Sequence, residues 1–193
     1  MGKSRLEAFS DGVFAILITI LVLELKVPHG EDWHALRPLV PTFLAYAMSF
    51  VFIAIYWNNH HHMLHASERI SGNVLWANTH LLFWLSLIPF TTAWMGEHHL
   101  APLPTAIYGA VLLVAGASYS ILQASLIRVH GPGSKLGEAT SGNVKEKASI
   151  LLYGAAIPLA FVRTWIAHLL YLTVALIWLV PDRRIEKRLR HDG

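Results

Sequence analysis

Six stretches of mostly apolar residues, separated by short polar connections, restrict what this sequence can fold into. They lie near residues 6–27, 39–59, 73–96, 103–127, 147–160 and 163–180. About 20 mostly apolar residues in a helix cross a bilayer, and the second to fourth stretches have that length. Of the 193 residues, 54% are hydrophobic and 14% are charged, against about 25% charged in a typical soluble domain. We therefore predict an all-α integral membrane protein, with residues 1–193 forming a single domain of six transmembrane helices.

The last two stretches are harder to separate, because residues 148–180 form one apolar region. As a single helix this region would be about 50 Å long, which exceeds one crossing of a ~30 Å hydrocarbon core. Pro158 and Arg163 interrupt it. We therefore predict two short helices joined by a tight turn.

The basic residues predict how the chain is oriented. Six spans place both termini and the connections 60–72 and 128–147 on one side. That side then carries twelve of the 15 Lys and Arg residues: Lys3, Arg5, Arg69, Arg128, Lys135, Lys145, Lys147, Arg183, Arg184, Lys187, Arg188 and Arg190. The other side carries Lys26, Arg37 and Arg163. Because cytoplasmic loops are enriched in Lys and Arg, we expect both termini in the cytoplasm and the chain in the cell (inner or plasma) membrane.

The first stretch has ionisable residues close to its apolar part. The twelve uncharged residues between Asp11 and Glu24 span about 18 Å of helix, well short of a ~30 Å core. The helix is therefore expected to continue through Asp11 toward Arg5 and through Glu24 toward Lys26. Ionisable groups at this depth are costly and are candidates for function. An interfacial salt-bridge network that fixes the helix end is the simpler interpretation, and the two are compatible.

One face of this first helix is a stripe of apolar residues and one hydroxyl. At 100° per residue, the stripe consists of Gly12, Ile16, Thr19, Ile20, Leu23 and Val27. A stripe of Ile and Leu is by default a helix-packing surface. A pore-lining surface is the alternative that periodicity alone does not favour.

Residues 5–11 read Arg-Leu-Glu-Ala-Phe-Ser-Asp. They resemble the R-x-x-x-F-S-D signature that opens the first helix in the bacterial branch of the transmembrane protein 175 family, the relatives of the lysosomal potassium channel. Residues 12–16 and the third span from Asn78 through Pro89 to Ala93 are also similar to that family. With six spans and a histidine-rich end to the second helix, the resemblance covers essentially the whole chain.

The resemblance implies a potassium-preferring cation channel that passes sodium less well. It implies a homotetramer in membrane lipid, with the first helix of each subunit lining a central pore, no cofactor, and no metal other than potassium in transit. The residues it assigns are a constriction at Ile16, Ile20 and Leu23, a selectivity-tuning hydroxyl at Thr19, and a structural motif of Arg5, Phe9, Ser10 and Asp11.

The side chains suggest how such a pore would work. A ring of isoleucines can close a pore by dewetting. Potassium is less strongly hydrated than sodium and should pass such a ring more readily, with modest discrimination. One pore helix per subunit cannot enclose a pore, so an oligomer is required.

Histidines suggest an enzyme as another class. They end the second stretch and follow the third: His60, His61, His62, His65, His98 and His99. Membrane-bound di-iron enzymes use repeated histidine boxes, but these clusters are predicted about a membrane apart and cannot ligate one site. We therefore expect no enzyme. We expect the 60–65 cluster to hydrogen-bond the first-helix motif, with a pH-sensitive contribution as a further option for histidine.

A secondary transporter for a cation or small solute is the competing function. Transporters show inverted repeats and discontinuous helices around polar midplane sites. Here the midplane is poor in charge, and Pro89 and Pro158 are the main potential breaks, so a channel is favoured. The basic C-terminal residues 183–190 lie against the membrane, where lipid headgroups rather than nucleic acid are the expected contact.

Overall fold

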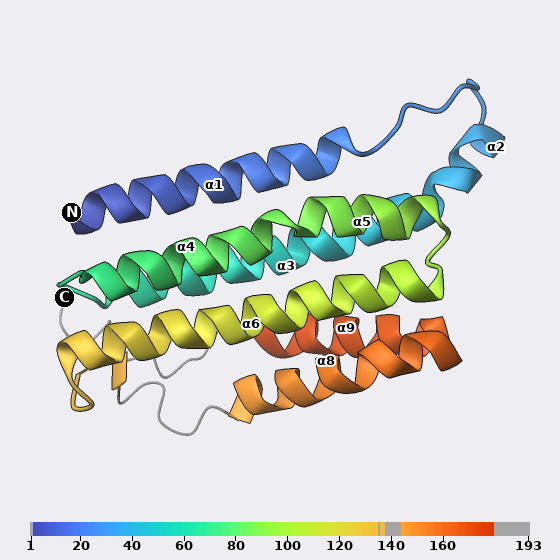
Figure 1. Ribbon diagram of the computed structural model, residues 1–193. Helices are drawn as coiled ribbons and strands as arrows, with labels where there is room; N and C mark the ends of the chain where they lie inside the picture. The colour runs from blue at the N-terminus through green and yellow to red at the C-terminus, as the bar shows by residue number, and fades with distance from the viewer. Residues whose placement is uncertain (1, 135, 138–143, 180–193) are drawn as a thin grey trace.

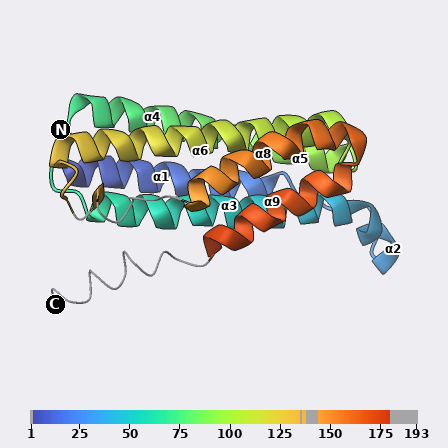
Figure 2. The same ribbon diagram turned by 90° about the horizontal axis from the view of Figure 1, so that it is seen from below.

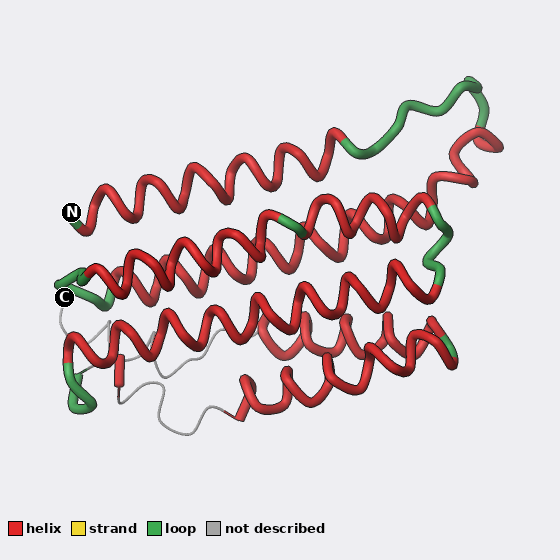
Figure 3. Tube along the Cα trace, viewed as in Figure 1, coloured by secondary structure: helices red, strands yellow, loops and turns green. Residues whose placement is uncertain are grey.

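The computed structural model describes residues 2–134, 136–137 and 144–179, which form an elongated helical bundle (Figure 1). Figure 3 shows helices joined by short loops throughout this described part of the chain, as the all-α prediction requires. Lys135 and the basic residues 183–190 lie outside the described residues. The helices are α1 (Lys3–Leu23), α2 (Trp33–Leu36), the short 3-10 helix η1 (Arg37–Leu39), α3 (Val40–His65), α4 (Gly72–Ser86), α5 (Ile88–Glu97), α6 (Pro102–His130), α8 (Val144–Val162) and α9 (Thr164–Leu179).

Four helical stretches of the described chain are long and apolar enough to cross a membrane. They are Lys3–Leu23, Trp33–His65, Gly72–Glu97 and Pro102–His130. Helix α9 is apolar but shorter, and the first turns of α8 contain the charged residues Lys145, Glu146 and Lys147. The chain is therefore a multi-pass membrane protein, and the count of six spans stays a prediction.

Helix α1 ends earlier than its sequence suggests. It runs from Lys3 to Leu23, and the last backbone hydrogen bonds at this end run from Glu24 N–H to the Ile20 carbonyl and from Leu25 N–H to the Val22 carbonyl. The expectation that the helix continues through Glu24 toward Lys26 is wrong. Pro28 disfavours helical backbone at the residue before it. Starting from Lys3, the 21 residues of α1 still span about 31 Å.

The two prolines named above behave differently. The third predicted span is broken at Leu87 into α4 and α5, because Pro89 has no N–H to donate and its ring clashes with the carbonyl four residues earlier. Pro158 instead lies inside α8. The predicted tight turn occurs at Arg163, between α8 and α9.

The connections are divided between the two ends of the bundle. Figures 1 and 2 show the N-terminus, the α3–α4 turn and the end of α6 at one end. The α1–α2 connection, the α5–α6 connection and the α8–α9 turn lie at the other end. Arg69 and Arg128 therefore lie at the N-terminal end, and Lys26 and Arg163 at the opposite end, as the six-span prediction arranges them.

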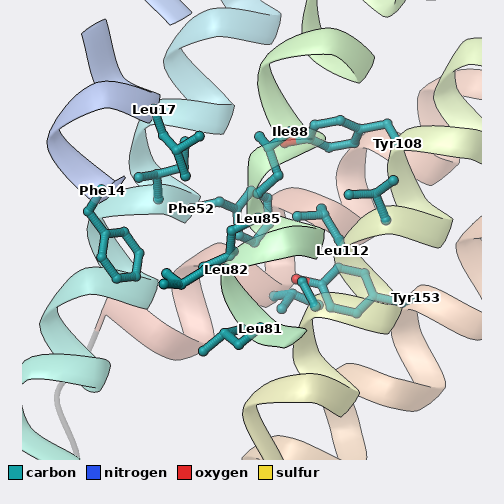
Figure 4. Close-up of a cluster of buried hydrophobic side chains, with 14 of the residues drawn as sticks. Phe14, Leu17, Phe52, Leu81, Leu82, Leu85, Ile88, Tyr108, Leu112 and Tyr153 are labelled. Carbon is teal, nitrogen blue, oxygen red and sulfur yellow. The ribbon is translucent and has the colours of Figure 1, made fainter. Parts of the chain in front are cut away.

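The core is formed where α3, α4, α5 and α6 pack together, with α1 along one edge and the α8–α9 hairpin along another (Figures 1 and 2). Figure 4 shows Phe14 and Leu17 of α1 beside Phe52 of α3 and the leucines of α4. Within this core, Ser49 hydrogen-bonds both Thr92 and Tyr108, at 2.7 and 2.9 Å. Helix α1 thus contributes one face to the core.

Candidate functional site

Helix α1 has two faces of opposite exposure. Leu6, Ser10, Phe14, Leu17 and Leu21 are buried against the other helices. Their spacing of three to four residues is that of one helical face. The opposite face is not covered by any other described helix of the protomer.

The predicted constriction residues all lie on that uncovered face. The side chains of Ile16, Ile20 and Leu23 are 58%, 38% and 74% exposed, and Gly12 and Thr19 are exposed beside them. Val27 was expected to extend the stripe, but it lies beyond the end of α1 and helical spacing no longer applies to it. We name the set Gly12, Ile16, Thr19, Ile20 and Leu23 the open face.

Thr19 provides the hydroxyl group of the open face. Its Oγ1 donates a hydrogen bond to the Ala15 carbonyl one turn earlier, at 2.8 Å. A hydroxyl has one donor and two acceptor lone pairs. Because the hydrogen is directed to the helix backbone, the oxygen presents acceptor capacity outward, which is the polarity that a cation requires.

A buried polar chain connects α1 to α3 and α4. The amide of Asn78 donates to Ser10 Oγ at 3.0 Å, and Ser10 Oγ donates to the Leu6 carbonyl at 2.9 Å. The other amide atom of Asn78, its carbonyl oxygen, lies 2.7 Å from His60 Nε2, so the imidazole donates this bond. All three side chains are fully buried, and Phe14 packs on the His60 ring at 5.5 Å. His60 therefore reaches the first-helix motif through Asn78.

Asp11 is bonded to α3. Trp57 Nε1 donates a hydrogen bond to Asp11 Oδ1 at 3.0 Å. Arg5 was expected to be a partner of this carboxylate, but in the described part of the chain no ion pair joins the two residues. Arg5 and Phe9 are exposed on the protomer, so the structure brings together only half of the predicted motif.

Two partners of this motif were not identified as such from the sequence. Trp57 lies near the end of the second predicted span, where tryptophan is common as an interfacial aromatic. Asn78 was noted only within a similar segment. Neither carries a local signal for its partner, because the pairing depends on how α1 is aligned against α3 and α4.

The opposite end of α1 is anchored by charge. Lys26, three residues beyond the helix, forms a hydrogen-bonded ion pair with Glu97 at the end of α5. This bond raises the pKa of the Lys26 ammonium group above its usual value, and the attraction of Glu97 adds to the shift. The pair is solvent-exposed, so its stabilising effect is small.

The histidine clusters lie at opposite ends of the bundle, at the end of α3 and after α5. Among the described residues there is no group of three or more His, Cys, Asp or Glu side chains arranged to hold a metal ion. A shared di-iron centre therefore has no ligand set in this part of the chain.

Two cavities lie beside α3, and α1 lines neither. One, of about 50 Å³, is enclosed by α3, α6, α8 and α9 and includes Tyr56, Asn59 and Glu146 in its wall. The other is an apolar groove of about 430 Å³ between α3 and α9. The open face therefore borders neither of these two cavities, and a pore along it needs a second surface.

The chain is similar to known ion channels. The family model described as the endosomal/lysosomal potassium channel TMEM175 matches residues 5–89. A potassium channel of Chryseobacterium sp. (strain P1-3) is 52% identical over 192 residues, which cover 100% of both chains. The endosomal/lysosomal proton channel TMEM175 of Gallus gallus is 42% identical over 73 residues, 32% of this chain and 15% of that protein.

A solved structure is also similar. The crystal structure of a lysosomal potassium-selective channel TMEM175 homologue from Chamaesiphon minutus superimposes with a TM-score of 0.79. It is 28% identical, and the match covers 93% of this chain and 97% of that chain.

Proposed function

Because the chain belongs to the TMEM175 family of ion channels, we propose that it is a potassium-preferring cation channel in which α1 of several copies lines a central pore. The single observation that carries the proposal is the open face of α1. It combines Ile16, Ile20 and Leu23 with the hydroxyl of Thr19, and no other described helix of the protomer covers it.

The pore requires more than one copy. One helix face cannot surround an ion, and neither cavity of the protomer is lined by α1. Copies arranged about a symmetry axis would cover the open faces with one another and enclose a passage. We propose four copies, the number that the resemblance of the α1 motif implies.

Ile16 is proposed as the narrowest ring, with Ile20 and Leu23 as further apolar layers one and two turns away. A ring of apolar side chains excludes water and thereby blocks ions without any charged gate. This constriction would be supported from behind by the buried face of α1, where Phe14 is 1% exposed.

Potassium preference is proposed to arise at Thr19. An apolar ring offers an ion no substitute for its hydration shell, so the more weakly hydrated potassium ion passes more readily than sodium. Hydroxyl oxygens directed toward the axis replace part of that shell. The acceptor capacity of Thr19 Oγ1, left by its bond to the Ala15 carbonyl, supports this role.

We propose six membrane spans, with α8 and α9 forming a short hairpin, and with both termini in the cytoplasm of the cell. The distribution of basic residues between the two ends of the bundle supports this orientation. The match to the Chamaesiphon minutus structure over 93% of the chain supports the same subunit architecture.

A secondary transporter has one apparent argument in its favour, the break between α4 and α5. Discontinuous helices in transporters expose backbone groups to substrate. Here Thr91 Oγ1 donates to the Leu87 and Ile88 carbonyls at the break, each at 3.1 Å. The Leu87 carbonyl also accepts from Thr91 N–H at 3.1 Å, and Leu87 N–H donates to the Trp84 carbonyl at 3.2 Å. These backbone groups at the break are thus bonded within the protein, which favours a channel.

The test is to record the current through purified protein in lipid bilayers under opposing potassium and sodium gradients. A second experiment applies a pH gradient instead. We expect steady current at rates beyond any carrier cycle, with a reversal potential that follows potassium. A reversal potential that follows the pH gradient would instead indicate proton conduction, the activity named for the Gallus gallus relative. Flux that requires a coupled second solute would indicate a transporter.

A further inference from the structure

Helices α1 and α3 lie antiparallel, with a regular register at the N-terminal end of the bundle (Figures 1 and 2). Asp11 accepts a hydrogen bond from Trp57 at 3.0 Å. Two turns away, Lys3 Nζ donates to the carbonyl oxygen of His65 at 3.2 Å. Between these two contacts the register moves eight residues back on α1 and eight residues forward on α3. The intermediate step of this register places Glu7 opposite His61.

The side chains of α3 form a column along this contact. The rings of Trp57 and His61 are stacked at 5.9 Å with an interplanar angle of 28°. The rings of His61 and His65 are stacked at 6.1 Å with an angle of 15°. Both histidines are exposed, and residues four apart lie one above the other on a helix. The two imidazoles therefore share one accessible face.

This column lies where water reaches it. The 26 residues of α3 span about 39 Å, longer than a ~30 Å hydrocarbon core. The apolar part of α3 ends near Trp57, and the following residues are Asn, Asn and the histidines. The last two turns of α3 thus extend beyond the hydrocarbon core. They do so at the end of the bundle that carries Lys3, Arg69 and Arg128.

Two histidines at positions i and i+4 on one helix face bind transition metals such as zinc. Imidazole nitrogen suits zinc, copper and nickel, whereas magnesium prefers oxygen ligands. Asp11 bonds Trp57, whose ring stacks on that of His61, so this carboxylate adds negative charge near the pair. Lys3 bonds the His65 carbonyl and lies 3.7 Å from Glu7, so these two charges offset each other. No other described His or carboxylate completes a group of three, so water would occupy the remaining coordination positions.

We propose that His61 and His65 form a binding site for one divalent transition-metal ion, at the contact between α3 and the N-terminal end of α1. Exposed side chains change rotamer on the picosecond to nanosecond timescale, which allows the stacked rings to turn toward a shared ion. The site is separate from the open face of α1 and does not depend on ion conduction.

Isothermal titration calorimetry of the full-length protein in detergent tests the site, with Zn²⁺ as the probe and Mg²⁺ as the oxygen-preferring comparison. At pH 7.5 we expect about one Zn²⁺ bound per chain above the background of the double variant His61→Gln/His65→Gln. Binding should weaken about tenfold or more in that variant. It should also disappear at about pH 5, because metal-binding imidazoles must be neutral.

His62→Gln is the matched control. His62 is adjacent to the pair, its ring meets that of His61 at 5.7 Å and 67°, and it points off the shared face. This variant should bind Zn²⁺ as the wild type does. The proposal is overturned if the wild type binds no Zn²⁺, if the double variant binds it equally well, or if His62→Gln removes binding. Circular dichroism of each variant verifies that all of them are folded.

Discussion

The indole Nε1 of Trp57 donates a hydrogen bond to the Asp11 carboxylate at 3.0 Å, joining α3 to the first helix at the level where its apolar stretch begins. Together with the buried Ser10–Asn78–His60 chain, this bond holds α1 from behind while its other face stays uncovered. The two faces of α1 therefore have separate roles, which makes their contributions separable by mutation.

Removal of the Trp57–Asp11 bond should destabilise the protein. Hydrogen bonds to charged groups contribute about 1.5–3 kcal/mol, and because Asp11 and Trp57 are both exposed, the expected loss is below about 1.5 kcal/mol. Thermal unfolding of Asp11→Ala, Trp57→Phe and the double variant measures it. A coupling near zero in this double-mutant cycle would contradict the interaction.

Asn78→Leu should destabilise more strongly than Asp11→Ala. The change leaves His60 Nε2 unsatisfied in a fully buried environment, which costs about 1–3 kcal/mol, and it removes the donor to Ser10 Oγ, which keeps its bond to the Leu6 carbonyl. Thr79→Leu is the matched control, because Thr79 is exposed and bonds only the backbone of its own helix. Chemical or thermal unfolding that ranks Thr79→Leu as equally damaging would argue against the buried chain.

Ile16→Asn should hydrate the proposed constriction and increase the leak of both potassium and sodium. Val22→Asn is the control on the same helix, since Val22 is 46% exposed but lies about 120° around the helix from Ile16. Single-channel recording compares the two variants. Unchanged conductance in Ile16→Asn, or an equal increase in Val22→Asn, would count against Ile16 as the narrowest ring.

Thr19→Ala should reduce the preference for potassium over sodium, because it removes the hydroxyl of the open face. Thr19→Ser keeps the hydroxyl and should retain most of the preference. Thr173→Ala provides a control, as Thr173 is exposed on α9 and bonds the backbone four residues earlier, as Thr19 does. The reversal potential under a potassium/sodium gradient is the measurement, and an unshifted value in Thr19→Ala would refute the role.

Gly109→Ala should destabilise the contact between α6 and α9. A Cβ atom at Gly109 would lie 2.0 Å from the Tyr171 hydroxyl, which donates to the Thr105 carbonyl at 3.0 Å. Overpacking costs about 1–3 kcal/mol, and loss of the hydrogen bond adds about 1 kcal/mol. At Gly154 no atom lies within 4 Å of such a Cβ, so Gly154→Ala should be neutral or stabilising. Thermal unfolding in detergent distinguishes the two.

Several structural features follow from local sequence alone. The turn at Arg163 and the helices around it appear where one apolar region is too long for a single crossing. The placement of Ile16, Ile20 and Leu23 on one face follows from helical periodicity, whereas the exposure of that face does not. The break at Leu87 is two residues before Pro89, which the sequence marks as a potential break but does not require, since Pro158 is accommodated within α8.

The partners of the motif do not follow from local sequence. His60 is buried against Asn78, whereas His61, its neighbour, is exposed, although both belong to one histidine run. Asp11 accepts a hydrogen bond from Trp57. It does not pair with Arg5 in the described structure, although Arg5 belongs to the same motif and is six residues away in sequence.

The sequence by itself determined that this chain is helical, lies in a membrane and begins with an apolar helix flanked by ionisable residues, because apolar length, helical period and charge placement are properties of contiguous residues. The tertiary structure decided which face of α1 is buried and which side chains bond its motif. Those outcomes depend on the relative register of helices distant in sequence, and a shift of one residue rotates a helix by 100° and replaces every contact.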